Sequence, residues 1–154
     1  MIANFFDKTK PINFLVLSIL AFIIFTTAVI KTNTAQYDFY FFAKNTVFLF
    51  VCIISVFVLN FIIRKNSLSD DNTYGILFYI LLGGLFPFTF SNGGVFISNF
   101  ILLFAFRRIY SLRTSLTPKE KIFDSAFWIG VASMFYLWSF AYILLLYAAI
   151  LVFR

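Results

Sequence analysis

The sequence predicts an all-α fold, a multi-pass bundle of about five to six transmembrane helices. Three observations predict it. Hydrophobic residues make up 62% of the 154 residues and charged residues 12%, whereas an ordinary globular domain is roughly half apolar and roughly a quarter charged. Uncharged apolar runs about as long as a bilayer crossing recur along the chain. The basic residues gather in alternate connecting segments, as they do in membrane proteins.

The first four membrane helices are expected over the ranges 12–30, 46–63, 74–90 and 92–109. The first range carries no charge and, as a helix, would extend about 28 Å, close to the hydrocarbon thickness. Pro11 suits the first position of that helix, where a missing N–H costs nothing. In the third range, Gly83, Gly84 and Pro87 predict a kink or an early end.

The last apolar stretch, 123–153, is too long for one ordinary crossing. We expect two shorter helices that meet near 137–139, and one strongly tilted helix is the alternative. Asp124 is expected to cap the start of this stretch. Since no linker interrupts the pattern, the whole chain, 1–154, is predicted to form a single transmembrane domain.

The distribution of lysine and arginine predicts a cytoplasmic N-terminus. With that orientation the outer segments carry two basic residues, Lys31 and Lys44, and Arg154 is left unassigned. The inner segments carry nine: Lys8, Lys10, Arg64, Lys65, Arg107, Arg108, Arg113, Lys119 and Lys121. The net charge of +6 therefore predicts membrane orientation and no nucleic-acid partner.

The residue types also limit the chemistry. The chain has no histidine, which excludes histidine acid–base catalysis and histidine-ligated metal sites within these residues. Its one cysteine, Cys52, lies in an apolar run and is given no role. We expect no cofactor and no metal site. Whether the chain is an enzyme stays open.

Two candidate sites follow from the remaining charges. Arg107, Arg108 and Arg113 lie at a predicted cytoplasmic membrane edge, where they could hold anionic lipid headgroups or a phosphate; the alternative is that they only set the topology. Asp38 is the acidic residue of the predicted outer segments, and it could act as a catalytic base or bind a cation; the alternative is a solvated loop residue.

Other polar residues are read structurally. The pair Asp70-Asp71 precedes the third helix, and we prefer helix capping to cation binding there. No Asp, Glu, Lys or Arg lies in the middle of a predicted helix, which counts against a transporter. Small or polar residues within the predicted helices suit contacts between helices. They are Ser18, Ser55, Asn60, Ser98, Asn99, Gly130 and Ser133.

Several segments resemble an uncharacterised Bacteroidota family of multi-pass inner-membrane proteins that bears a domain of unknown function. The segments are Met1-Ile2-Ala3-Asn4-Phe5-Phe6 with Lys8-Thr9-Lys10-Pro11-Ile12-Asn13-Phe14, Asn60-Phe61-Ile62-Ile63-Arg64-Lys65-Asn66, Arg107-Arg108-Ile109, and Phe123-Asp124 leading to Trp128-Ile129-Gly130-Val131-Ala132-Ser133. The resemblance implies an inner-membrane location, brings no assigned activity, and leaves open that the chain is an N-terminal portion of a longer protein.

The range 93–153 is also similar to membrane glycosyltransferases that use polyprenyl-phosphate-linked sugars. Those enzymes place an acidic residue or pair in the first outer loop, where this sequence has Asp38 alone. We therefore expect a non-catalytic subunit of a membrane complex in the bacterial cell envelope, with the lipid bilayer, anionic lipid headgroups and other membrane proteins as partners. A membrane glycosyltransferase is the alternative.

Overall fold

The computed structural model describes residues 6, 10–32, 38–69, 72–114 and 117–153, and every regular element among them is a helix. In chain order the elements are α2 (Pro11–Thr32), α3 (Phe39–Lys65), α4 (Tyr74–Leu85), α5 (Phe88–Ser91), α6 (Gly93–Ser111), η1 (Leu112–Thr114), α7 (Pro118–Phe135), η2 (Leu137–Tyr142) and α8 (Ile143–Val152), where η marks a 3₁₀-helix. This confirms the predicted all-α class.

Three helices in the described part of the chain are long and apolar enough to cross a membrane: Pro11–Thr32, Phe39–Lys65 and Gly93–Thr114. Tyr74–Leu85 and Leu137–Val152 are shorter apolar helices. The chain separates into two compact units, Met1–Asn92 and Gly93–Arg154. They are called unit 1 and unit 2 below, and each is described by itself.

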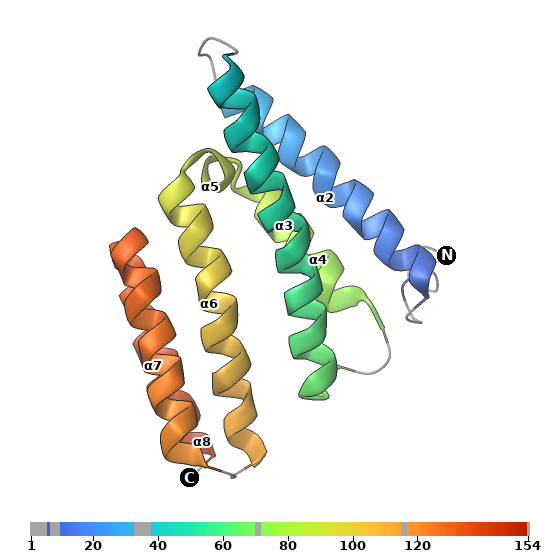
Figure 1. Ribbon diagram of the computed structural model, residues 1–154. Coiled ribbons are helices and arrows are strands. Elements are labelled where there is room, and N and C mark those ends of the chain that lie inside the picture. Colours follow the sequence, from blue (N-terminus) through green and yellow to red (C-terminus); the bar gives the residue numbers. More distant parts are fainter. Residues whose placement is uncertain (1–5, 7–9, 33–37, 70–71, 115–116, 154) are drawn as a thin grey trace. The chain divides into compact units, whose positions relative to one another are not determined.

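In unit 1, α2, α3 and α4 contact one another, and α5 contacts α2 (Figure 1). The core lies where these helices meet. It consists of Phe6, Leu17, Ala21, Val56, Ile76 and Ile80. The rings of Phe25 on α2 and Phe90 on α5 pack edge to face, with centroids 5.7 Å apart. Most other large apolar side chains of α2 and α3 stay exposed, which suits helices that face lipid.

α4 ends at Leu85, inside the region where the glycines and the proline predicted an early end. Residue 86 precedes Pro87, whose ring disfavours helical backbone at that position, and its φ of −119° and ψ of 69° lie outside the helical region. The two glycines do not break the helix. A Cβ built on Gly84 would lie 3.1 Å from Cγ2 of Ile24, so this glycine permits the close approach of α4 to α2.

α3 begins at Phe39, although the sequence predicted its start near residue 46. The range 39–45 contains aromatic residues that were interpreted as part of a connecting segment at the membrane surface. It contains no proline or glycine, so nothing in it stops a helix from extending towards Asp38. Aromatic residues near a membrane surface therefore do not by themselves mark a loop.

The start of α4 is held by residues on both sides of the predicted caps Asp70-Asp71, which lie outside the described residues. Oδ1 of Asn72 accepts hydrogen bonds from the Tyr74 amide at 3.3 Å and from Oγ of Ser69 at 3.1 Å. The fully buried Thr73 donates from both its amide and its hydroxyl to the Phe6 carbonyl, at 3.0 and 3.1 Å. The two bonds from Thr73 hold Phe6 at the start of α4.

In unit 2, α6 packs along α7, and both contact α8. The core of the unit consists of Leu102, Ala105, Ile109, Leu112, Ile129, Ala132 and Leu146. α7 ends at Phe135, and Tyr136 is extended, with φ −149° and ψ 109°. The chain then reverses, so that α8 ends near the start of α7 (Figure 1). The stretch 123–153 is thus broken at Tyr136, and the alternative of one tilted helix is wrong.

α7 begins at Pro118, with proline at the favoured first position and Thr117 before it in the left-handed region at φ 45°. The predicted start near residue 123 is therefore wrong. Asp124 lies in the second turn of α7, too far from the free backbone N–H groups of the first turn to cap them. The prediction that Asp124 caps this helix is wrong as well.

Candidate functional site

The carboxylate of Asp124 pairs with an arginine of the neighbouring helix. Nη2 of Arg108, in the last turn of α6, lies 2.8 Å from Oδ2 of Asp124 on α7. The two side chains are 44% and 34% exposed. An ion pair with this exposure contributes little energy, commonly under about 1 kcal/mol, and it links α6 to α7 near one end of the two helices.

Lys121 makes a second link between the same helices. Its side chain is only 8% exposed. Nζ donates hydrogen bonds of 2.7 Å to the Ser111 carbonyl and 2.7 Å to Oγ1 of Thr114. The Ser111 carbonyl belongs to the last residue of α6 and lacks a partner within that helix, but it accepts from the ammonium group and, at 2.9 Å, from Oγ1 of Thr114. The ammonium group also complements the negative end of the helix dipole. The sequence interpretation treated Lys121 only as a topology-setting charge and missed this contact.

The three predicted lipid- or phosphate-binding arginines lie at one end of unit 2. Arg107 and Arg108 are in the last turns of α6, and Arg113 is on η1, which contacts both α6 and α7. Arg113 is exposed, whereas Arg108 is engaged with Asp124. Anion binding by these residues stays a prediction.

A buried pair of serines lies where α6 meets the break between α7 and η2. Oγ of Ser98 donates to the Ala132 carbonyl at 3.0 Å and is also hydrogen-bonded to Oγ of Ser139. Since Ser98 gives its proton to the carbonyl, Ser139 is the donor in the second bond. The Ala132 carbonyl also accepts the Tyr136 amide at 3.1 Å. The two serines are 1% and 3% exposed, so these bonds stabilise the break inside an apolar core.

The serine pair confirms that Ser98 serves a contact between helices, as its position in an apolar run predicted. Gly130 does not. A Cβ built on Gly130 meets nothing within 4 Å, so no helix packs against that position in the described structure. Ser55 and Ser133 donate instead to carbonyls of their own helices, Val51 and Gly130 respectively, each at 2.7 Å. Such bonds satisfy the hydroxyl locally and leave no specific link to a neighbour.

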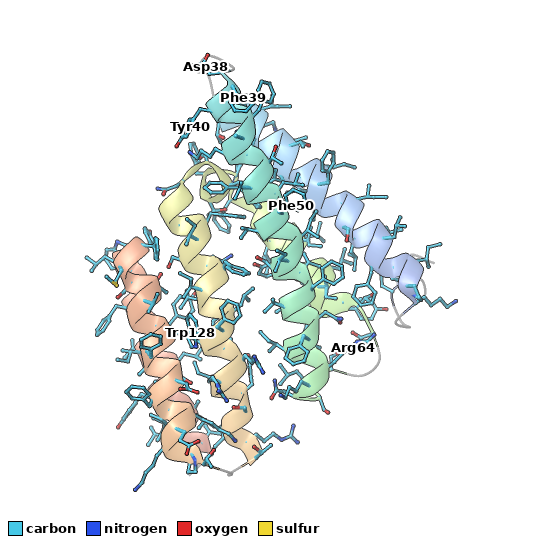
Figure 2. All side chains as sticks on the ribbon, viewed as in Figure 1. Asp38, Phe39, Tyr40, Phe50, Arg64 and Trp128 are labelled. Carbon is cyan, nitrogen blue, oxygen red and sulfur yellow. The ribbon has the colours of Figure 1, made fainter. Side chains whose placement is uncertain are left out.

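Asp38 precedes the first residue of α3 and is exposed. Its backbone carbonyl accepts the Phe42 amide at 3.2 Å, but its carboxylate makes no capping bond. Phe39 and Tyr40 follow it at the start of α3 (Figure 2). They are 89% and 77% exposed. Asp38 belongs to unit 1 and the predicted arginines belong to unit 2, so neither unit by itself brings them together.

These contacts are mainly structural. The ion pair, the lysine and the serine pair each join α6 to α7 or to the segment that follows α7. No family model, curated protein or solved structure matches the chain.

Proposed function

We propose that this chain is a non-catalytic helical subunit of a membrane complex in the bacterial inner membrane. One observation carries the proposal. An exposed apolar stripe runs along α3 through Phe50, Ile54, Phe57 and Phe61, which are 60%, 47%, 52% and 46% exposed. Successive members are three or four residues apart, so they lie on one face of the helix. In a bilayer, such a face can receive the side chains of a partner helix.

The internal contacts of unit 2 support the same proposal. Three of its buried polar residues hold its own helices together: Ser98 and Ser139 in the core and Lys121 at one end. These three side chains are thus committed to structure and not held ready for a substrate. A scaffold that presents apolar faces to neighbours accounts for both the exposed and the buried residues.

Site-specific photo-crosslinking in intact cells tests the proposal. A photoreactive phenylalanine analogue at Phe50 or Phe57 should form adducts with a discrete partner protein. The matched control is Phe25, which is 2% exposed and should give no intermolecular adduct. If Phe50 and Phe57 form adducts with lipid alone, α3 faces only the bilayer and the proposal fails.

We further propose six membrane crossings with the N-terminus in the cytoplasm. The six residues of η2 and the ten of α8 form one continuous helical path of about 27 Å, because a 3₁₀-helix rises more per residue than an α-helix. That length approaches the hydrocarbon thickness. Reporter fusions after Asn92 and after Thr117 should report the outer and the cytoplasmic side respectively, and the reverse result would overturn this topology.

The alternative function, a glycosyltransferase that uses a polyprenyl-phosphate-linked sugar, is favoured by Asp38. Its carboxylate is exposed, makes no capping bond and is followed by two exposed aromatic residues. In this alternative Asp38 is the catalytic base, because an uncommitted carboxylate can accept a proton from an incoming hydroxyl. The Asp38→Asn variant should then abolish envelope glycosylation while Glu120→Gln preserves it. Unchanged glycosylation in Asp38→Asn cells would exclude this function.

A further inference from the structure

One face of α7 carries a positive charge at its start and apolar residues along the rest of its length. Lys119 in the first turn is exposed. Phe123, Phe127 and Met134 follow it on the same face and are 70%, 55% and 84% exposed. Gly130 belongs to this face too, because it lies three residues after Phe127 and four before Met134. We call these five residues the α7 stripe.

Open space lies over the α7 stripe at Gly130, where an added Cβ would meet nothing within 4 Å. Between Phe127 and Met134 the stripe therefore exposes helix backbone to whatever surrounds the protein. Gly130 lies about 16 Å along the helix axis from Lys119. That distance is about half of the hydrocarbon thickness of a bilayer, the depth that one acyl chain reaches from its headgroup.

Arg113 is a second exposed cation near the start of α7, on the η1 segment that contacts this helix. It lies on η1, next to Thr114, whose hydroxyl accepts the bond from Lys121 in the first turn of α7. The Lys121 contacts therefore hold this segment against the same turn that carries Lys119. Arg113 and Lys119 are both exposed, and between residues 107 and 124 the chain has five basic residues and two acidic ones. Asp124 is already paired with Arg108.

We propose that the α7 stripe and Arg113 bind one anionic phospholipid. Its phosphate contacts the guanidinium of Arg113 and the ammonium of Lys119, and one acyl chain lies over Phe123 and Phe127 and ends at Gly130. Charge complementarity selects an anionic headgroup, and the apolar residues that continue from the charged end select an acyl chain. The proposal requires the protein to lie in a membrane but does not depend on its having a protein partner.

The test uses the whole purified chain, freed of lipid in detergent. The protein is titrated with phosphatidylglycerol, phosphatidylcholine or inorganic phosphate, and bound lipid is measured by native mass spectrometry. Wild-type protein should retain one phosphatidylglycerol and prefer it to phosphatidylcholine. The double variant Arg113→Gln/Lys119→Gln should bind phosphatidylglycerol about thirtyfold more weakly. Each cation near the membrane surface contributes about 1 kcal/mol of binding free energy, and the loss of two raises Kd by about that factor. The control Lys31→Gln/Lys44→Gln removes the same charge from exposed residues of unit 1 and should bind as wild type.

The variant Gly130→Leu tests the path of the acyl chain, because it fills the open space without changing any charge. It should weaken phosphatidylglycerol binding and leave the melting temperature in detergent unchanged. The proposal is overturned if phosphatidylcholine binds as tightly as phosphatidylglycerol, or if inorganic phosphate displaces bound phosphatidylglycerol as well as free phosphatidylglycerol does. It is also overturned if the Lys31→Gln/Lys44→Gln control weakens binding as much as Arg113→Gln/Lys119→Gln, or if Gly130→Leu binds phosphatidylglycerol as wild type. A photoreactive group at Phe127 that crosslinks to protein and not to lipid would also overturn it, whatever the result at Phe50.

Discussion

Replacing Ser98 by alanine should destabilise unit 2 by about 1.2 kcal/mol, since hydrogen bonds between membrane helices contribute about 0.6 kcal/mol each on average. Ser98 makes two such bonds, to the Ala132 carbonyl and to Ser139. Ser139→Ala removes one of them and should cost about 0.6 kcal/mol. The double variant should cost no more than Ser98→Ala, because the bond between the two hydroxyls is already lost.

The free energy of unfolding can be measured by titrating the folded protein in mixed micelles with a denaturing detergent and following helix content. Ser133→Ala is the matched control. Its hydroxyl donates within its own helix, to the Gly130 carbonyl, so its removal should change the free energy of unfolding little. If the effects of Ser98→Ala and Ser139→Ala add fully in the double variant, the two hydroxyls are not coupled. In that case the account of the serine pair is wrong.

Two further predictions concern packing and charge. Gly84→Leu should destabilise unit 1 by about 1–3 kcal/mol in the same assay, because the new side chain would overlap Ile24, whose Cγ2 lies 3.1 Å from a Cβ at that position. Gly130→Leu, with open space around it, should leave the free energy of unfolding unchanged. Equal effects of the two variants would refute the packing argument. Arg108→Gln should lower the free energy of unfolding by under about 1 kcal/mol at low salt and by less in high salt, as expected for a partly exposed ion pair with Asp124. If the loss does not depend on salt, the ion pair is not the cause of the destabilisation.

The sequence could predict features that depend on neighbouring residues. Pro87 marks the end of α4 because a proline restricts the residue before it, and this effect is local. A break near 137–139 was expected because the 31-residue stretch 123–153, in which Asp124 is the one charged residue, exceeds one crossing, and the structure has the break at Tyr136. The start of α7 was missed although Pro118 carries a usable signal, the preference of proline for the first helical position.

The candidate site was less predictable because its contacts join different helical segments. Arg108 and Asp124 pair across two helices, and the pairing depends on the rotation of each helix about its axis. The same is true of Lys121, whose partners lie seven and ten residues earlier. Charge counting identified these residues as a basic segment but could not distinguish a side chain that satisfies a helix end from one that remains exposed, such as Arg113.

The 3₁₀ segment η2 sets the rotational phase of the helix that follows it. Each 3₁₀ residue turns the chain by about 120°, against about 100° in an α-helix. Over the six residues of η2, the two conformations therefore differ by about 120° in the direction that α8 faces. Leu146, which completes the core of unit 2, would leave that core if η2 became α-helical or gained or lost a residue. Insertions in this short segment should therefore be tolerated far less well than its exposed aromatic side chains would imply.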